Sequence, residues 1–444
     1  MLSCKFGKNF IIEISGGSHE AEMRAVLFGL PEGTIINMAQ LTQFLARRAP
    51  GNSPLSTSRK EPDTPFLVKN GQYCQPDTIT VDRNEELIFA IKNTNYRKKD
   101  YNLTIPRPGH ADLPAHLKYG DQVNMSGGGP FSGRMTAMLS IAGGIAIQIL
   151  EKHGISVKAA PLSIGNAINK NLDFSSSNYY DISHEMTQEI LSSKEEKDSI
   201  GGIIEFFVEG LPSGLGGPMQ DGLESCLSYI LYGIPAVKGI EFGNGFKCSS
   251  LKGSQNNDPI LSIDESNKII TETNNHGGIL GGISTGMPLT GRVACKPTPS
   301  IGKPQRTIDL TSGKPYILET EGRHDPCIVP RAVPVVEAAL AIGILDMLLA
   351  HGLPSQAENQ LDQCRNEIDA IDKQLKALLD KRMNVAKRVA HYKMENNMEI
   401  YHPQREQAIL DKVEPHYRDI FAEIMNTSKK IQQNLINNRK EKNL

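Results

Sequence analysis

Glycine, histidine and arginine gather in four short segments, and these are the residues best suited to chemistry. The segments cover residues 16–20, 107–112, 126–134 and 322–327. An imidazole titrates near neutral pH, and glycines before a helix expose backbone N–H groups to an anion. Six arginines accompany the segments: Arg47, Arg48, Arg107, Arg134, Arg323 and Arg331. Arginine forks bind phosphates and carboxylates, so the pattern predicts a pocket for a ligand that carries both groups.

The glycine runs do not match two common nucleotide-binding loops. No Gly-Lys-Ser or Gly-Lys-Thr follows 126–134, as a Walker loop requires, and G-x-G-x-x-G is absent. A further run, 277–286, would let the backbone approach a flat or phosphorylated ligand closely. Any one of these runs, taken alone, is more often a tight turn than a binding site.

Composition narrows the class of protein and its partners. Lys+Arg 48 against Asp+Glu 50 gives a net charge of −2, which argues against nucleic acid as a partner. The seven cysteines form no C-x-x-C pair, so we expect reduced thiols and no metal site. The first residues lack the pattern of a signal peptide, and the apolar run 137–150 is shorter than the about 20 residues that span a bilayer. We therefore expect a cytoplasmic protein with no membrane contact.

Glycine usage divides the chain into a body and a tail. All 40 glycines lie at or before Gly352. In the body, apolar runs predict strands at 10–14, 78–81, 87–91 and 203–208, and helices at 136–153 and 333–350. The expected fold is α+β followed by all-α, with a body of 1–352, a linker of 353–359 and a helical domain of 360–444.

The tail predicts three helices, over about 356–394, between Pro403 and Pro415, and over 417–438. The first is too long to be covered by two short partners, so its apolar stripe implies pairing with a second copy. A plain coiled-coil dimeriser is one interpretation. Arg382 argues for another, because it occupies a position of the stripe where an apolar residue is expected. A buried arginine needs an anionic partner, either a ligand or a carboxylate.

From about residue 1 to 350 the chain resembles chorismate synthase. The residues that carry the resemblance are Arg107-Pro-Gly-His-Ala-Asp112, the run 277–286, Gly322-Arg-His-Asp-Pro-Cys327 and Arg331-Ala-Val-Pro334. The resemblance implies a β-α-β sandwich and the anti 1,4-elimination of phosphate from 5-enolpyruvylshikimate 3-phosphate, which gives chorismate. It also implies reduced FMN as cofactor, and it leaves open whether the enzyme reduces its own flavin with NADPH.

The resemblance also implies roles for individual residues. His19 and His110 would handle protons beside the flavin and the leaving phosphate, and Asp325 would lie near flavin N5 and help to remove the C6 proton by way of the flavin. The substrate's phosphate and carboxylates would be held by Arg48, Arg107, Arg134 and Arg331. FMN contacts would come from Pro130, Phe131, Ser132, Pro235, Ala236, Gly281, Lys296, Pro297, Thr298, Pro299, Ser300 and Arg323. The chain departs from the family's pattern at Pro54, Pro130 and Met135.

The tail, over about 360–436, resembles the all-helical chorismate mutases. The residues that carry this resemblance are Arg365, Arg382, Lys393, Arg405, Glu406, Ser428 and Gln432. They imply that the arginines and Ser428 bind the substrate, that Lys393 and Gln432 donate to the ether oxygen, and that Glu406 binds the ring hydroxyl. A [3,3] rearrangement of chorismate to prephenate needs only a compressed conformer and such donors. His402 stands where the family usually has Asp.

Spacing along the first tail helix predicts a shared active site. Arg365 and Lys393 are about 42 Å apart on a straight helix, too far to contact one ten-carbon substrate. Arg365 must therefore reach the site of a second copy, and we expect a homo-oligomer, a tetramer if both parts associate. We therefore interpret the chain as a bifunctional shikimate-pathway enzyme that acts on 5-enolpyruvylshikimate 3-phosphate and then on chorismate. The alternative is a monofunctional synthase whose tail is a dimerisation or regulatory module.

Overall fold

The computed structural model describes most of the chain, in two compact units, residues 1–360 and 361–444. The described residues are 2–51, 55, 61, 63–93, 104–264, 269–320, 325–353, 356–396, 398–399 and 401–442. Side chains are not described at 121, 356–367, 369–370, 373, 436 and 438–442. Arg323 and Pro54 lie outside the described residues, and Arg365 is described only as part of a helix.

Two antiparallel sheets form the outer layers of the first unit. The six-stranded sheet has the order β1 (Ser3–Phe6), β2 (Ile11–Gly16), β3 (Glu22–Phe28), β8 (Leu87–Lys92), β5 (Phe66–Lys69) and β6 (Gln72–Cys74). The five-stranded sheet has the order β10 (Ala167–Ile168), β9 (Ser156–Ile164), β11 (Gly202–Glu209), β17 (Leu289–Cys295) and β12 (Val237–Phe242). Four two-stranded pairs complete the described strands: β4 (Ile35–Asn37) with β7 (Thr78–Thr80), β13 (Ile260–Ile263) with β14 (Ile269–Thr271), β15 (Ile279–Leu280) with β16 (Ile283–Ser284), and β18 (Gln305–Ile308) with β19 (Pro315–Leu318).

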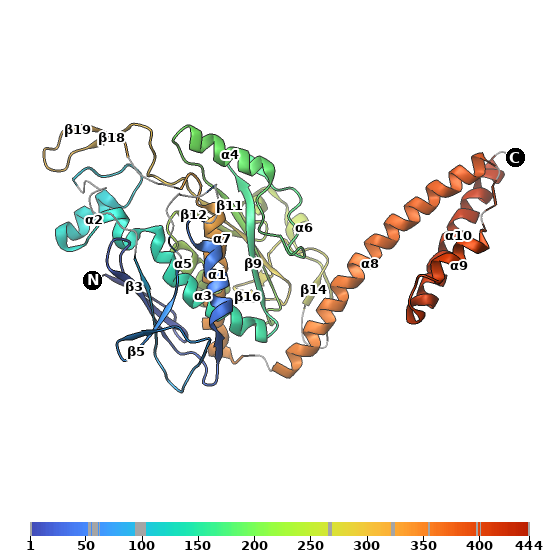
Figure 1. Ribbon diagram of the computed structural model, residues 1–444, viewed down its shortest axis with the longest axis horizontal. Helices are drawn as coiled ribbons and strands as arrows, with labels where there is room; N and C mark the ends of the chain where they lie inside the picture. The colour runs from blue at the N-terminus through green and yellow to red at the C-terminus, as the bar shows by residue number, and fades with distance from the viewer. Residues whose placement is uncertain are drawn as a thin grey trace. The chain divides into compact units, whose positions relative to one another are not determined.

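Helices fill the space between the two large sheets (Figure 1). The central ones are α1 (Met38–Arg48), α3 (Thr136–Lys152), α5 (Leu223–Tyr232) and α7 (Val329–His351). The remaining described helices of this unit are α2 (Asp112–Tyr119), α4 (His184–Glu195) and α6 (Gly253–Asn256). Helices α3 and α7 approach closely because Gly143 has no side chain, and a Cβ there would lie 2.2 Å from Ala338 Cβ. The α+β body is therefore a layered β-α-β sandwich, as expected.

The predicted strands and helices of the body are confirmed, with one shifted start. Helix α7 begins at Val329, several residues before the expected start after Pro334. Pro330 occupies its first turn, where a missing N–H costs nothing, and Pro334 lies inside the helix. The shift matters for the site because it puts Arg331 in the first turn of α7.

Two described segments are long and apolar enough to cross a membrane by length and composition alone. They are Gly133–Lys152 and Val329–His351, and 83% and 89% of their most apolar windows are buried. Both therefore form the core of this unit, and their apolar character is explained by the layers packed on them.

The second unit is helical. Its helices are α8 (Gln356–Glu395), α9 (Pro403–Leu410) and α10 (Arg418–Lys442), with a short 3-10 turn over Pro415–Tyr417. Helix α8 begins within the segment 353–359 expected as a linker. Its apolar stripe is largely exposed in the single chain: Ile368, Ile371, Leu375, Leu378, Val385, Val389 and Tyr392.

Candidate active sites

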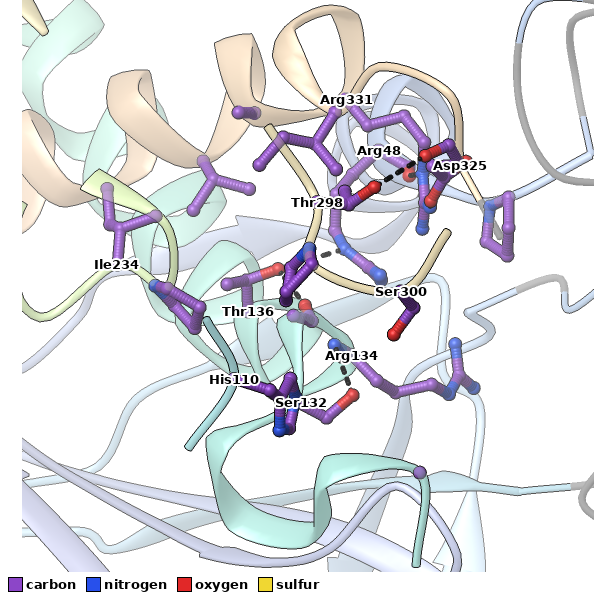
Figure 2. A pocket seen from close by; sticks show the side chains of 18 of the residues that line it. Arg48, His110, Ser132, Arg134, Thr136, Ile234, Thr298, Ser300, Asp325 and Arg331 are labelled. Carbon is purple, nitrogen blue, oxygen red and sulfur yellow. Dashed lines mark hydrogen bonds and ion pairs between the residues drawn. The ribbon is translucent and has the colours of Figure 1, made fainter. Parts of the chain in front are cut away.

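A cavity of about 250 Å³ lies where several loops of the first unit meet the first turns of α3 and α7 (Figure 2). Eleven of the residues that the synthase resemblance singles out line it: Arg48, Arg107, His110, Ser132, Arg134, Pro235, Thr298, Pro299, Ser300, Asp325 and Arg331. They come from positions almost 300 residues apart in sequence. The tertiary structure therefore brings the separate motifs into one site.

Each of the four predicted substrate arginines is paired with a carboxylate. Arg48 Nη1 lies 2.5 Å from Asp63 Oδ2, and Arg107 Nε lies 2.7 Å from Asp112 Oδ2. Arg331 pairs with Asp325. The positive charge of the cavity is thus balanced by acidic groups of the chain itself, which sets the electrostatic environment that an anionic ligand meets.

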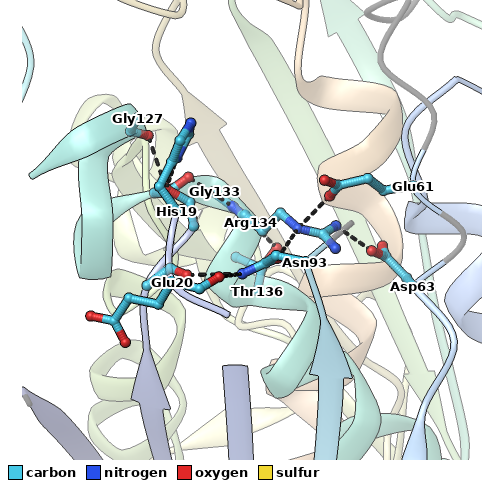
Figure 3. A network of polar contacts seen from close by, with 12 residues as sticks. His19, Glu20, Glu61, Asp63, Asn93, Gly127, Gly133, Arg134 and Thr136 are labelled. Carbon is cyan, nitrogen blue, oxygen red and sulfur yellow. Dashed lines mark hydrogen bonds and ion pairs between the residues drawn. The ribbon is translucent and has the colours of Figure 1, made fainter. Parts of the chain in front are cut away.

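Two carboxylates that pair with these arginines, Glu61 and Asp63, were not predicted from the sequence. Arg134 Nε lies 2.5 Å from Glu61 Oε2 and donates to Asn93 Oδ1 at 3.0 Å, and its Nη1 pairs with Asp63 (Figure 3). Both acids are at most 2% exposed. The signal available in the sequence was only a short acidic pair around a proline, and nothing in its spacing pointed to Arg134, which is 71 positions from Asp63.

Arg48 is the most deeply placed of the four arginines. Burial lowers its pKa to about 10, and the neighbouring charges of Arg331 and Arg134 act in the same direction while Asp63 opposes them. Its side chain is 2% exposed. A cation held in this way gains from any additional anion that enters the cavity.

Arg47 was expected to belong to the same pocket, and this expectation is wrong. Its guanidinium makes two hydrogen bonds to Glu337, Nη1 to Oε2 at 2.6 Å and Nη2 to Oε1 at 3.0 Å. Glu337 also accepts from the Ala159 N–H and the Tyr179 hydroxyl. Neighbouring positions on a helix differ by about 100° in direction, so Arg47 contacts Glu337 while Arg48 lines the cavity.

The two predicted histidines lie against neighbouring glycines. Gly127 and Gly128 have φ of +64° and +95°, and side chains there would collide with the imidazoles. A Cβ on Gly127 would lie 2.0 Å from His19 Cε1, and one on Gly128 would lie 3.1 Å from His110 Nε2. Glycine is therefore required at both positions for conformation and for space. His19 itself does not line the cavity, but Gly127 in front of it does.

Local hydrogen bonds hold both imidazoles. His19 is 4% exposed, and its Nδ1 lies 3.0 Å from the hydroxyl of Ser18, which also lies within reach of two backbone carbonyls. His110 Nδ1 lies 2.7 Å from Asp112 Oδ1. Burial alone would raise the pKa of Asp112, but hydrogen bonds from Arg107 and His110 outweigh it and hold that pKa below its ordinary value.

Only part of the predicted flavin-contact set lines the cavity. The residues outside its lining are Pro130, Phe131, Ala236, Gly281, Lys296 and Pro297. Lys296 is nevertheless close, since its Nζ donates to the Gly109 carbonyl at 2.5 Å. Gly281 lies in the β15–β16 turn, and Arg323 lies outside the described residues.

A second cluster joins α8 and α10 in the helical unit. Arg382 Nη1 donates to Ser428 Oγ at 2.6 Å and to the Ile424 carbonyl at 3.3 Å. Gln432 lies one turn beyond Ser428 and is 8% exposed, and its Oε1 has no hydrogen-bond partner among the side chains that the structure describes. A buried polar atom without a partner is costly, so this group is suited to a polar ligand.

The other predicted mutase residues lie at the ends of the helices. Lys393 is in the last turn of α8, and Arg405 and Glu406 are in the first turn of α9. Lys429 Nζ lies 3.0 Å from Glu406 Oε2, a contact between α10 and α9 that sequence reasoning missed. Arg365 is in α8, but its side chain is not described, so its predicted reach into a second copy is not tested by the structure.

Comparisons with known proteins agree with this division of the chain. The chorismate synthase family profile matches residues 10–349, and the chorismate mutase type II profile matches residues 364–433. Chorismate synthase of Pyrococcus abyssi is 41% identical over 353 residues, covering 77% of this chain and 97% of that protein. Chorismate synthase of Korarchaeum cryptofilum is 38% identical over 358 residues, covering 78% and 97%.

A solved structure, described as a crystal structure of chorismate synthase, shares the fold. Its TM-score is 0.58 at 23% identity, and the alignment covers 83% of this chain and all of that one. The match of the tail to a mutase profile also speaks against its being only a dimerisation or regulatory module. The chain therefore belongs to the chorismate synthase family, and the chorismate mutase type II domain at its C-terminal end makes it an enzyme of two activities, a lyase joined to an isomerase.

Proposed function

We propose that the two parts of the chain act in sequence, converting 5-enolpyruvylshikimate 3-phosphate to chorismate and then chorismate to prephenate. Domain bounds of 1–352 and 360–444, joined by 353–359, fit this division. The observation that carries the proposal is the presence in one chain of an arginine-lined cavity with His110 at its wall and a separate Arg382–Ser428–Gln432 cluster.

In the synthase cavity, the arginines bind and orient a substrate with one phosphate and two carboxylates. Arg48 and Arg331 lie together, since Arg331 Nε donates to the Arg48 carbonyl at 2.9 Å, and both line the cavity. His110 lines the cavity and supplies a proton to the departing phosphate, which gains negative charge, and His19, behind Gly127, is the second proton-handling histidine. Asp325, held by Arg331, accepts a proton at the opposite wall. Elimination breaks the C3–O bond, the C6–H bond and the π bond of the ring C=C that lies between them, and it forms two C=C bonds, a net gain of one that gives the conjugated diene.

The residues of the cavity also fit a planar, phosphorylated cofactor such as FMN. The fit rests on Gly127, which lines the cavity, and on the walls formed by Pro235 and by Thr298, Pro299 and Ser300. These residues, with Ser132, would hold the cofactor. Reduced FMN, when bound, supplies electron density that assists the C–O cleavage in a reaction without net redox change.

In the mutase domain, charge complementarity organises the rearrangement. Arg382, already aligned by Ser428, binds a substrate carboxylate. Gln432 and Lys393 donate to the ether oxygen, where negative charge grows as that bond breaks. Glu406 accepts from the ring hydroxyl, and Arg405 adds positive charge beside it. No nucleophile or cofactor is required.

Assembly completes the proposed mutase site. The exposed stripe of α8 buries itself against a second copy, which also brings Arg365 of that copy within reach of the substrate. Association of the synthase parts as well gives a homotetramer. The six described cysteines are free thiols and both long apolar helices are buried, which supports a cytoplasmic enzyme.

An anaerobic reaction with 5-enolpyruvylshikimate 3-phosphate and reduced FMN tests the proposal. We expect prephenate as the final product, identified after chromatographic separation. The Arg382→Ala protein should accumulate chorismate under the same conditions. Accumulation of chorismate by the unmodified protein would remove the second activity and leave the tail a structural or regulatory module.

A further inference from the structure

Asp112 occupies a position between a predicted catalytic histidine and a predicted substrate arginine. Its carboxylate accepts the Arg107 N–H groups at Nε (2.7 Å) and Nη2 (2.8 Å), and the Arg107 backbone N–H at 3.1 Å. It also lies 2.7 Å from His110 Nδ1. All three residues fall within the short segment 107–112, and Asp112 opens helix α2.

We propose that Asp112 is a positioning residue of the synthase reaction, which fixes the tautomer and stabilises the charge of His110, and that Arg107 acts chiefly by holding Asp112. This inference rests on the proposed proton-handling role of His110. It gives Arg107 a task different from direct contact with a substrate anion.

The hydrogen-bond chemistry decides the tautomer. An ionised carboxylate can only accept, so the 2.7 Å contact requires a hydrogen on His110 Nδ1. Arg107 Nη2 also lies near that nitrogen, at 3.1 Å, but a guanidinium can only donate and has Asp112 Oδ1 at 2.8 Å as its acceptor. With Nδ1 committed, Nε2 is the nitrogen that gains and loses the exchangeable proton.

That second nitrogen is directed at the glycine run. An ideal Cβ on Gly128 would be 3.1 Å from His110 Nε2, and Gly128 is buried beside Gly127, a residue of the cavity wall. Because His110 itself lines the cavity, Asp112 leaves Nε2 of that imidazole as the atom available to the proposed leaving phosphate.

The donors of Arg107 are largely used inside the protein. Its Nε and Nη2 donate to Asp112, and its Nη1 donates to Ser300 Oγ at 3.0 Å. The Arg107 side chain is 9% exposed. Holding a carboxylate by two parallel hydrogen bonds is the geometry in which arginine is most effective.

The charges near His110 determine how its protonation should respond to a change at Asp112. Arg107 and Asp112 face it from its own loop, and Lys296 approaches that loop from the segment after β17 through the Gly109 carbonyl. His19 lies against the adjacent glycine, Gly127. Asp112 is the anion among these groups. Without its negative charge, the positive charge of Arg107 disfavours the protonated form of His110.

The test compares Asp112→Asn with Asp258→Asn in the full-length protein. Asp258 is a matched control because it accepts from His276 Nδ1 at 2.8 Å, away from the cavity. We expect Asp112→Asn to lower kcat for chorismate formation by about 10- to 100-fold with a smaller change in KM, and to move the basic limb of the pH–rate profile about one unit lower. Asp258→Asn should leave both unchanged.

A second readout does not depend on catalysis. Deuterium exchange at the imidazole C2 position, followed by mass spectrometry in the cofactor-free protein, reports the pH at which each histidine titrates. The midpoint for His110 should move to lower pH in Asp112→Asn and return toward the original value in Asp112→Glu. An unmoved midpoint in a folded Asp112→Asn protein would overturn the proposal even if kcat fell.

His110→Asn separates failure of this inference from failure of the proposed function. Loss of chorismate formation in His110→Asn, with a normal pH profile in Asp112→Asn, would overturn only the role of Asp112. Full activity in His110→Asn would overturn the role of the histidine and the inference with it. Mutase activity on added chorismate should persist in every variant, and an unchanged first unfolding transition of the full chain in urea shows that the synthase part remains folded.

Discussion

The Arg48 guanidinium lies 2.5 Å from the Asp63 carboxylate, Nη1 to Oδ2, and both side chains are almost fully buried. The other oxygen of Asp63 pairs with Arg134. One acid thus links two of the four arginines around the cavity. Removing one partner of a buried ion pair strongly destabilises the folded state, because the remaining charge stays buried without a counter-charge.

Substituting Asp63 by Asn should therefore destabilise the synthase part by about 3–5 kcal/mol. The measurement is the shift in the first unfolding transition of the full chain in urea. Asp221→Asn is the matched control, because Asp221 pairs with Lys8 at 3.2 Å while both side chains are more than 70% exposed. Equal midpoints for the two variants would contradict the role given to Asp63.

The glycine run makes a second prediction. Gly127→Ala should abolish chorismate formation, since the new Cβ would lie 2.0 Å from His19 Cε1 and the backbone has φ of +64°. Gly253→Ala is the control, because a Cβ there meets nothing within 4 Å. Steady-state rates for chorismate formation, with the first unfolding transition of the full chain in urea as a check of folding, decide the outcome. Near-normal synthase rates in Gly127→Ala would show that His19 need not keep its position.

Arg382 offers a test confined to the second activity. Arg382→Lys keeps the charge but loses the planar fork that meets Ser428 and, in the proposed site, a carboxylate. We expect kcat/KM for chorismate to fall by about 100-fold or more while chorismate formation is unchanged. Arg388→Ala, an exposed arginine on the same helix, should retain the mutase rate. A comparable loss of kcat/KM in both variants would mean that the mutase rate depends on the total charge of α8 and not on Arg382 in this site.

The exposed stripe of α8 predicts an assembly defect. Leu378→Asp places a charge at a position that is 61% exposed in the single chain but covered in the proposed pairing of two copies. Multi-angle light scattering should show a smaller assembly, and mutase activity should fall with it. Lys381→Asp, on an exposed polar position of the same helix, controls for the added charge. An unchanged molar mass and rate for Leu378→Asp would exclude this face as the interface.

The depressed pKa of Asp112 predicts how its contribution depends on pH. The folded state binds the proton of this carboxyl more weakly than the unfolded state, whose Asp side chains titrate near about 3.9. Its interactions with Arg107 and His110 therefore stabilise the protein above that pH and are lost as pH falls through the folded-state pKa. The difference in melting temperature between the original protein and Asp112→Asn should be large near pH 7 and shrink on acidification. A difference independent of pH would contradict this account.

Much of the organisation could be predicted from sequence because it depends on local pattern. Glycine usage separated body from tail, the period of apolar residues located α3, α7 and α8, and the motifs around His110 and Asp325 identified the family. Arg382 was anomalous in an apolar stripe for a reason that lies within one helix pair, where it meets Ser428. These features can be recognised in the sequence because the residues that form each pattern are neighbours along the chain or along one face of a helix.

Only the tertiary structure decided which charges meet. Asp63 and Arg134 are 71 positions apart, and Arg47 and Glu337 are 290 apart, yet both pairs are joined inside the protein. Arg47 and Arg48 look equivalent in sequence. Adjacent positions on a helix point about 100° apart, so Arg47 contacts Glu337 and Arg48 lines the cavity. The physical reason is that a buried charge must find its partner in three dimensions, where chain distance has no bearing on Coulomb energy or on desolvation.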